Sequence, residues 1–199
     1  PSEVLVIADA KANPRYIAAD LLSQAEHDTL ACSILLTPSQ DIAEKVAVEV
    51  DKQLAKLSRN EIAKKSIESY GRIVVTETME EAIDLANEIA PEHLELAVEN
   101  PFDYLNKIRN AGAIFLGEYS PEPLGDYFAG PNHTLPTSGT AKFASPLSVD
   151  AFIKKSSVIY YTREALTAVK DKIIRIAESE TLTAHANSIR VRFESDEDE

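Results

Sequence analysis

The sequence predicts an α/β protein, built on a parallel sheet flanked by helices, with a smaller helical appendage at its C-terminal end. Apolar runs of strand length alternate with segments of helical periodicity over the first two thirds of the chain, which is typical of βαβ units and a parallel sheet. From residue 148 onward the patterns become mainly helical. We therefore predict an α/β domain over residues 1–147, a helical appendage over 148–193 and an acidic tail over 194–199.

The individual elements follow from these patterns. The expected strands are the runs EVLVIA, ACSILLT, RIVVTE, HLELAV and AIFLG. The expected helices between them are PRYIAADLLSQAEH, a long helical region over about residues 41–70, MEEAIDLANEIA and PFDYLNKIRN. In the appendage we expect a helix over about residues 163–179 and a segment, TLTAHANSIRVRF, that is helical at its start.

Composition excludes several classes of function. The chain of 199 residues has 20 Lys and Arg against 33 Asp and Glu, a net charge of -13, so a basic surface for nucleic acid or anionic membrane is not expected. Its single cysteine, Cys32, cannot form a disulfide framework, which favours a cytoplasmic location. No apolar run approaches the roughly 20 residues needed to span a bilayer.

The segment GDYFAGPNHTLPTSGTAKFASPL, residues 125–147, is the most unusual part of the sequence. It holds three of the six glycines and three of the ten prolines, a composition that disfavours helices and interior strands. A loop of this length in a compact domain is usually functional or disordered. It follows the last expected strand, and ligands of open parallel sheets bind beyond the carboxyl ends of the strands. We therefore expect a functional loop there.

Two pairs of candidate site residues come from the α/β domain. Gln24 and His27 are three residues apart on one helix face, and they are either a satisfied core amide beside an exposed imidazole or a chelating pair. Glu92 and His93 follow Pro91, which ends a helix, and they are either surface charges at a helix stop or an acid/base pair.

Further candidates lie in the long loop and near the C-terminus. Asp126 and His133 are in the loop, and Glu180 with His185 adds a carboxylate and an imidazole. Two imidazoles, a carboxylate and a carboxamide oxygen form a ligand set that zinc occupies readily. The chain has no G-x-G-x-x-G motif, so the usual dinucleotide fingerprint is missing.

Four runs of the sequence closely resemble the histidinol dehydrogenase family. They are SQAEHD at 23–28, APEHLEL at 90–96, GDYFAGPNHTLPTSGTAKFASPLSV at 125–149 and ESETLTAHANSIRVR at 178–192. The resemblance extends from residue 1 to about 193. It implies a zinc enzyme that oxidises L-histidinol to L-histidine through L-histidinal, with two hydride transfers to NAD.

The resemblance also implies roles for individual residues. The zinc ligands would be Gln24, His27, Asp126 and His185, which would also bind substrate together with Ser2, His93 and Glu180. His93 would take the alcohol proton, and Glu92 would activate the water that hydrates the aldehyde. The role of His133 stays open.

Family members are about twice as long as this chain and are homodimers, in which His185 and Glu180 would complete the neighbouring subunit's site. The resemblance therefore implies the C-terminal half of the enzyme, an incomplete Rossmann-like domain without the part that supplies most NAD contacts, so the isolated chain could be inactive. Two alternatives are a non-catalytic metal-binding or dimerisation module and a relative that oxidises another small polar alcohol.

Overall fold

A computed structural model describes residues 1–194 of the chain, and the remaining residues of the predicted acidic tail lie outside this part. The described chain forms two compact units, the first spanning Pro1–Ile153 and the second beginning at Lys154. Each unit is described by itself. The proposed domain boundary after residue 147 stays a prediction.

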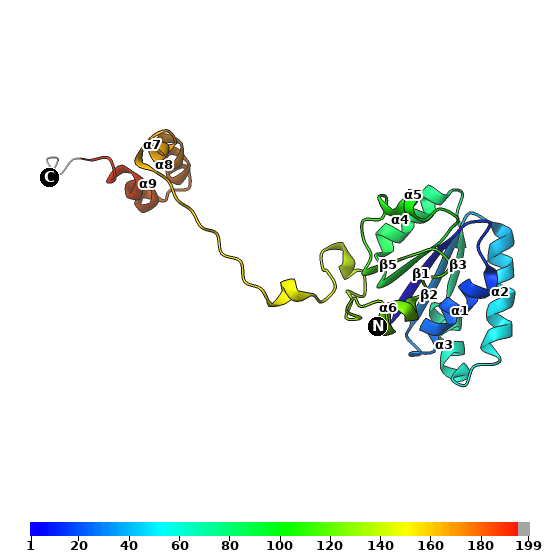
Figure 1. Ribbon diagram of the computed structural model, residues 1–199. Coiled ribbons are helices and arrows are strands. Elements are labelled where there is room, and N and C mark those ends of the chain that lie inside the picture. Colours follow the sequence, from blue (N-terminus) through cyan, green and yellow to red (C-terminus); the bar gives the residue numbers. More distant parts are fainter. Residues whose placement is uncertain (195–199) are drawn as a thin grey trace. The chain divides into compact units, whose positions relative to one another are not determined.

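The first unit is built on a five-stranded parallel sheet (Figure 1). Its strands lie in the order β3-β2-β1-β4-β5, so β1 is in the middle and the chain winds outward from it in both directions. The strands are β1 Glu3–Ala8, β2 Cys32–Thr37, β3 Arg72–Val75, β4 His93–Ala97 and β5 Ala113–Leu116. The predicted α/β fold with a parallel sheet is confirmed.

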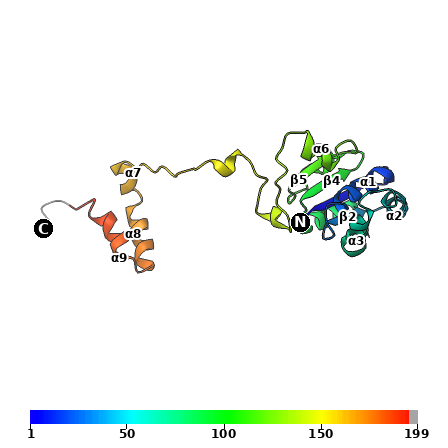
Figure 2. The same ribbon diagram turned by 90° about the horizontal axis from the view of Figure 1, so that it is seen from below.

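Helices cover both faces of this sheet (Figure 2). Residues of α1 and α2 pack on one face together with Ile67 of α3, whereas α4 and Tyr104 of α5 pack on the other. The helices of this unit are α1 Pro14–Ala25, α2 Gln40–Leu54, α3 Asn60–Tyr70, α4 Met79–Ile89, α5 Phe102–Leu105 and α6 Glu122–Tyr127, followed by short 3₁₀ turns at Thr140–Lys142 and Val149–Phe152.

The pleat of the central strand explains how one apolar run fills two cores. Val4, Val6 and Ala8 of β1 face α1 and α2, while Leu5 and Ile7 face α4. All five side chains are buried. A strand covered on both faces is continuously apolar instead of alternating, which is why EVLVIA contains no polar residue after Glu3.

Two predicted helices are divided in the structure. The region 41–70 forms α2 and α3, which are separated by residues 55–59. The region 163–179 of the second unit forms α7 Arg163–Thr167 and α8 Lys170–Ser179, followed by α9 Thr183–Arg190. The hydroxyl of Thr167 donates a hydrogen bond to the Arg163 carbonyl, a side-chain contact that often bends helices, at the point where α7 ends.

The prediction that a loop begins at residue 125 is wrong. Gly125 and Asp126 lie inside the short helix α6 and not in a loop. The prolines at the start of α6 occupy positions that a helix tolerates. Pro121 precedes the helix, and Pro123 is in the first turn, where backbone N–H groups need no helical acceptor. Asp126 is therefore presented by a helix.

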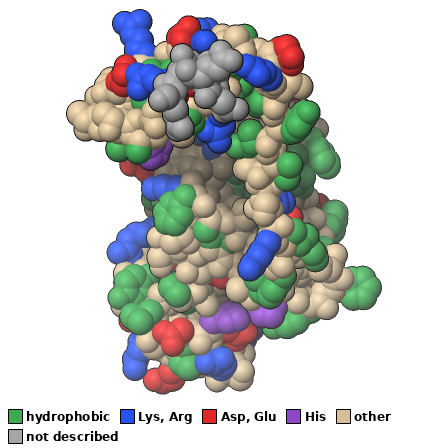
Figure 3. Space-filling view, turned by 90° about the vertical axis from the view of Figure 1, so that its left-hand side faces the viewer, with side chains coloured by type: hydrophobic (Ala, Val, Ile, Leu, Met, Phe, Trp, Pro, Cys, Tyr) green, Lys and Arg blue, Asp and Glu red, His purple; other side chains and the backbone are tan. Residues whose placement is uncertain are grey.

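Several large apolar side chains are exposed, and Figure 3 shows such side chains at the surface on one face of the molecule. They include Val158, Ile159 and Tyr160, which lie ahead of α7 in a segment without regular structure. Among the described helices, none is both long and apolar enough to cross a membrane.

Leu36 on β2 tests the importance of the core that packs against α4. Its side chain is buried, so Leu36→Ala should lower the free energy of unfolding by roughly 2–5 kcal/mol, because it leaves a cavity. Leu30→Ala, at a residue that is 65% exposed, is the matched control and should change it by less than about 0.5 kcal/mol. Urea unfolding followed by circular dichroism measures both. Equal losses would contradict this packing.

Candidate functional site

The candidate residues gather at the amino ends of the central strands, not at the carboxyl ends as expected. Glu3 and His93 are the first residues of β1 and β4. The reason is that the chain after β5 turns back along the sheet: the backbone N–H of Ser138 donates to a carboxylate oxygen of Glu3 at 2.8 Å. The chain after β5 therefore returns to the opposite end of the sheet from the one where β5 ends, and Asp126, 4.0 Å from His93 Nε2, is already there.

The end of α4 positions Glu92 and His93. Ala90 caps the helix in the left-handed conformation, with φ of 55°, and Pro91 then prevents its continuation. Glu92 and Glu3 exchange hydrogen bonds, since the backbone N–H of each donates to the other's carboxylate, at 3.0 Å and 3.3 Å. This pair holds the Glu92 carboxylate beside the His93 ring, where Glu92 Oε2 is 3.6 Å from His93 Nδ1.

His93 is held as a neutral imidazole with one free nitrogen. Its Nδ1 is 2.9 Å from the carbonyl oxygen of Glu3, which can only accept, so we assign the proton to Nδ1. Nε2 is then an acceptor, and it is buried without a hydrogen-bond partner among the described residues. Burial lowers the pKa of His93 below its ordinary value of 6.5. The ring is therefore ready to accept a proton at Nε2.

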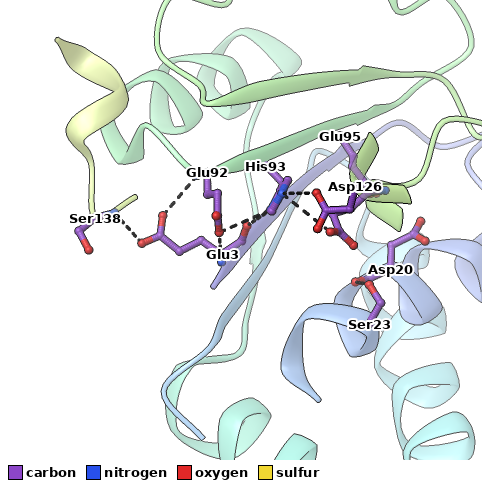
Figure 4. A network of polar contacts seen from close by, with 9 residues as sticks. Glu3, Asp20, Ser23, Glu92, His93, Glu95, Asp126 and Ser138 are labelled. Atoms are coloured by element: carbon purple, nitrogen blue, oxygen red, sulfur yellow. Dashed lines mark hydrogen bonds and ion pairs between the residues drawn. The ribbon is translucent and has the colours of Figure 1, made fainter. Parts of the chain in front are cut away.

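Two carboxyl groups of α6 face this nitrogen, and Figure 4 shows one of them, Asp126, beside the His93 ring. Glu122 Oε1 is 3.9 Å and Asp126 Oδ1 is 4.0 Å from His93 Nε2. They are four residues apart and so lie on one side of the helix. Glu122 is not predicted from the sequence, because its four-residue spacing from Asp126 indicates a shared face only if the segment is a helix.

Burial raises the pKa of two of these acids into the neutral range. The pKa of Glu92 is raised to about 7, chiefly because its carboxyl is desolvated. Burial, and to a smaller extent the neighbouring Asp126, raises the pKa of Glu122 to about 7 as well. Glu92 can therefore exchange a proton near neutral pH, which is what general acid/base chemistry requires.

A second pair of carboxyl groups lies behind the first. Glu95 of β4 is buried, and its Oε1 accepts a hydrogen bond from the backbone N–H of Glu122 at 2.8 Å. Burial, followed by the charge of Asp20, raises the pKa of Glu95 to about 9. Burial also raises the pKa of Asp20, to about 6, while its hydrogen bond with Glu95 opposes that rise. Glu95 is therefore the protonated partner and donates to Asp20.

Gln24 and His27 lie at and just beyond the end of α1. Gln24 is buried in the last turn, and its Oε1 has no hydrogen-bond partner within the described chain. His27 is exposed in the following turn, and a positive charge on it lowers the pKa of His93, which places the two imidazoles in electrostatic range. A buried carboxamide oxygen without a partner costs free energy unless something binds it.

The donor set fits a divalent metal ion. His93, Glu122 and Asp126 each offer a ligand atom within 4.8 Å of one another, and Asp126 is the member that also belongs to the predicted zinc set. The unpartnered oxygen of Gln24 is a further donor that a cation would satisfy. Asp126 and Gln24 therefore fit the metal that the sequence resemblance implies, whereas a metal ion on His93 Nε2 would occupy the nitrogen that a base needs.

The remaining predicted residues are not brought into this cluster by any contact in the described part of the chain. Ser2 precedes β1, where its carbonyl accepts from the N–H of Cys32 at 2.9 Å. His133 is exposed in the long segment. Glu180 and His185 belong to the second unit, so their roles stay predictions.

A cavity of about 480 Å³ lies beside Asp126. Its wall is formed by β5, by α6 and by residues of the long segment, and it is mostly apolar. Phe115 contributes to this wall and lies next to His93, with the two ring centroids 6.0 Å apart. An organic molecule in this cavity would therefore lie against Asp126.

Gly125 allows α6 to approach the sheet closely enough to present Asp126. A Cβ atom there would lie 2.7 Å from the Phe115 ring, so Gly125→Ala should displace α6 and destabilise the protein by about 1–3 kcal/mol. Thermal unfolding measures the loss. Adding Phe115→Leu removes the ring and should restore part of the stability. An unchanged unfolding temperature in the single variant would show that α6 does not pack there.

Known proteins similar to this chain agree with the resemblance in its sequence. A sequence model of the family described as histidinol dehydrogenase matches residues 1–193. Histidinol dehydrogenases of Caldanaerobacter subterraneus subsp. tengcongensis and Clostridium acetobutylicum are 63% and 61% identical to it, over 96% and 97% of this chain but 44% and 45% of those proteins. The crystal structure of histidinol dehydrogenase from Elizabethkingia anophelis matches with a TM-score of 0.88 at 45% identity, covering 96% of this chain and 44% of that one. The chain thus spans about half the length of these relatives, and it belongs to the histidinol dehydrogenase family.

Proposed function

We propose that this chain supplies the metal-binding and acid/base residues of a histidinol dehydrogenase, which oxidises L-histidinol through L-histidinal to L-histidine with two NAD. The observation that carries the proposal is the state of His93: a neutral imidazole with its proton on Nδ1 and a buried, unpartnered Nε2 within the described chain. An alcohol oxidation needs such a base, and the neighbouring Glu92 supplies a second proton acceptor.

In the first oxidation, His93 Nε2 takes the proton of the substrate hydroxyl. The hydride on the same carbon passes to NAD, so a C–H and an O–H bond break and a carbonyl bond forms. The hydrogen bond from Nδ1 to the Glu3 carbonyl keeps the ring in place while Nε2 becomes protonated. The carboxylates of Glu122 and Asp126 lie close enough to stabilise the resulting imidazolium.

In the second oxidation, ionised Glu92 accepts a proton from water while the water oxygen adds to the aldehyde carbon. The adduct is then a hydrate with one oxygen ionised, and when it loses its C–H hydride to a second NAD this oxygen becomes the carbonyl of the carboxylic acid. The pKa of about 7 leaves a large fraction of Glu92 ionised at neutral pH while keeping it basic enough to accept a proton.

The proposed metal is zinc, held by Gln24, His27 and Asp126 of one chain with His185 of a second copy, while Ser2 and Glu180 contact the substrate. When bound, zinc would orient the amine and imidazole of histidinol and offset negative charge in the site. In support, Gln24 Oε1 is buried without a partner in the described chain, and Asp126 faces the same cluster as His93. The proposal includes a homodimer.

The proposal assigns the NAD contacts to the part of the enzyme that lies outside the match. This chain corresponds to 44–46% of the first relatives, and it has no G-x-G-x-x-G motif. A cytoplasmic location is part of the proposal, on the grounds of the single cysteine and a biosynthetic role.

Substitutions at His93 and Glu92 should separate the two oxidations. In a protein of the relatives' full length, His93→Asn should slow histidinol oxidation by roughly 100-fold or more, because the alcohol proton loses its acceptor. Glu92→Gln should slow histidinal oxidation more than histidinol oxidation. NADH formation from each substrate, measured in single turnovers, reports both steps, and Glu61→Gln on the exposed face of α3 is the control.

Full activity of both variants would show that neither residue carries the proton. Oxidation of another small polar alcohol but not of histidinol would keep the enzyme class and change the substrate. Metal binding without oxidation of any alcohol would favour a non-catalytic metal-binding module.

Gln24 tests the metal assignment without reference to catalysis. Gln24→Ala removes the unpartnered oxygen and should weaken zinc binding by at least about tenfold, measured by competition with a chromophoric chelator. Gln40→Ala, at an exposed glutamine of α2, is the matched control and should leave the affinity unchanged. Equal zinc affinities of both variants and the wild type would remove Gln24 from the ligand set.

A further inference from the structure

Glu95 is a buried acid to which the proposed reaction gives no role. It lies in the middle of β4, two residues after His93, so both side chains point to the face of the sheet that α1 covers. Its neighbours Leu94 and Leu96 are apolar core residues. Burying a carboxyl group is costly unless its hydrogen bonds are satisfied, so its contacts indicate what it does.

The contacts of Glu95 connect two helices to the sheet. On one side its Oε1 accepts the backbone N–H of Glu122, the first residue of α6, at 2.8 Å. On the other side its carboxyl group hydrogen-bonds with Asp20 of α1. Figure 4 shows Glu95 and Asp20 beside the site formed by His93 and Asp126. The Glu95 carboxyl group is therefore bound to α6 and to α1 at once.

Helix α6 depends on such an external contact. It has only six residues, and a helix this short is not stable by itself. The preceding residue, Pro121, has no side-chain hydrogen-bonding group, so it cannot cap the helix. Glu95 takes that place from the neighbouring strand. The helix carries Glu122 at its start and Asp126 one turn later, and both face His93 Nε2.

We propose that Glu95 is a positioning residue that fixes the start of α6 on the sheet and so places Glu122 and Asp126 opposite His93. The inference rests on the proposed function in that Asp126 is taken as a metal ligand. It extends that function to a residue that touches neither substrate nor metal and acts through the backbone of α6. Asp20 holds the Glu95 carboxyl in the orientation that α6 requires.

Two substitutions of Glu95 distinguish its attachment of α6 from the effect of its charge. Glu95→Gln keeps a carbonyl oxygen for the Glu122 N–H and an N–H donor for Asp20, whereas Glu95→Leu keeps the size but neither hydrogen bond. Asn87→Leu is the matched control: Asn87 is also buried, and its Oδ1 accepts the backbone N–H groups of Arg109 and Asn110 in a turn before β5. It should cost stability without moving α6.

The first readout is amide hydrogen exchange of residues 122–127 in the metal-free, full-length protein. Exchange there should become at least about tenfold faster in Glu95→Leu, because α6 loses its attachment, and should stay within about twofold of the wild type in Glu95→Gln and Asn87→Leu. The second readout is affinity for Co²⁺, followed by its visible absorption. It should fall at least about tenfold in Glu95→Leu only.

Unchanged exchange over α6 in Glu95→Leu would overturn the proposal. So would equal losses in Glu95→Gln and Glu95→Leu, since the charge or the proton would then matter and not the attachment. If Asn87→Leu lost as much Co²⁺ affinity as Glu95→Leu, Glu95 would contribute only to the general stability of the fold and not to the position of α6. If the wild type bound no Co²⁺ and oxidised no histidinol, the proposed function would fail, while the exchange measurement would still decide whether Glu95 fixes α6.

Discussion

The site depends on the hydrogen bond between the Nδ1 of His93 and the carbonyl oxygen of Glu3. It is possible only because β1 and β4 are neighbours in the sheet, in a register that places Val4 beside His93. A backbone carbonyl does not ionise, so it fixes the tautomer of the neutral ring and remains an acceptor for Nδ1 when the ring is protonated. Every role given to Nε2 follows from this one contact.

Around this contact, the carboxyl groups of Glu92, Glu122 and Asp126 lie within 4.0 Å of a ring nitrogen of His93. Burial keeps the carboxyl groups of Glu92, Glu95 and Glu122 partly or fully protonated near neutral pH, so the cluster avoids the repulsion that fully ionised neighbours would suffer. A divalent cation would relieve the same repulsion by favouring the ionised forms. The fold therefore tolerates the cluster without a metal ion, and the same cluster would favour the binding of one.

The sequence predicted the sheet because apolar strands and amphipathic helices alternate along it, and local periodicity is enough for that. It predicted Glu92, His93 and Asp126 by their motifs, and the structure places these three side by side. Glu122 and Glu95 were not found. Glu122 needed α6 to be recognised in a segment rich in proline and glycine, and Glu95 looked like the polar position of an ordinary strand.

The end of the sheet at which the site lies could not be read from local patterns at all. It depends on contacts between residues far apart in the sequence: Asp126 lies 4.0 Å from His93, and Ser138 donates to Glu3, 135 positions away. Parallel strands begin at one edge and deliver their following loops to the other, so a site at the amino ends needs a segment long enough to return. Residues 117–127 provide that return path, because Asp126 at the end of α6 already lies beside His93, and the chain then continues as irregular structure to Glu3. The helix that this composition hid is therefore the element that brings Asp126 back to His93.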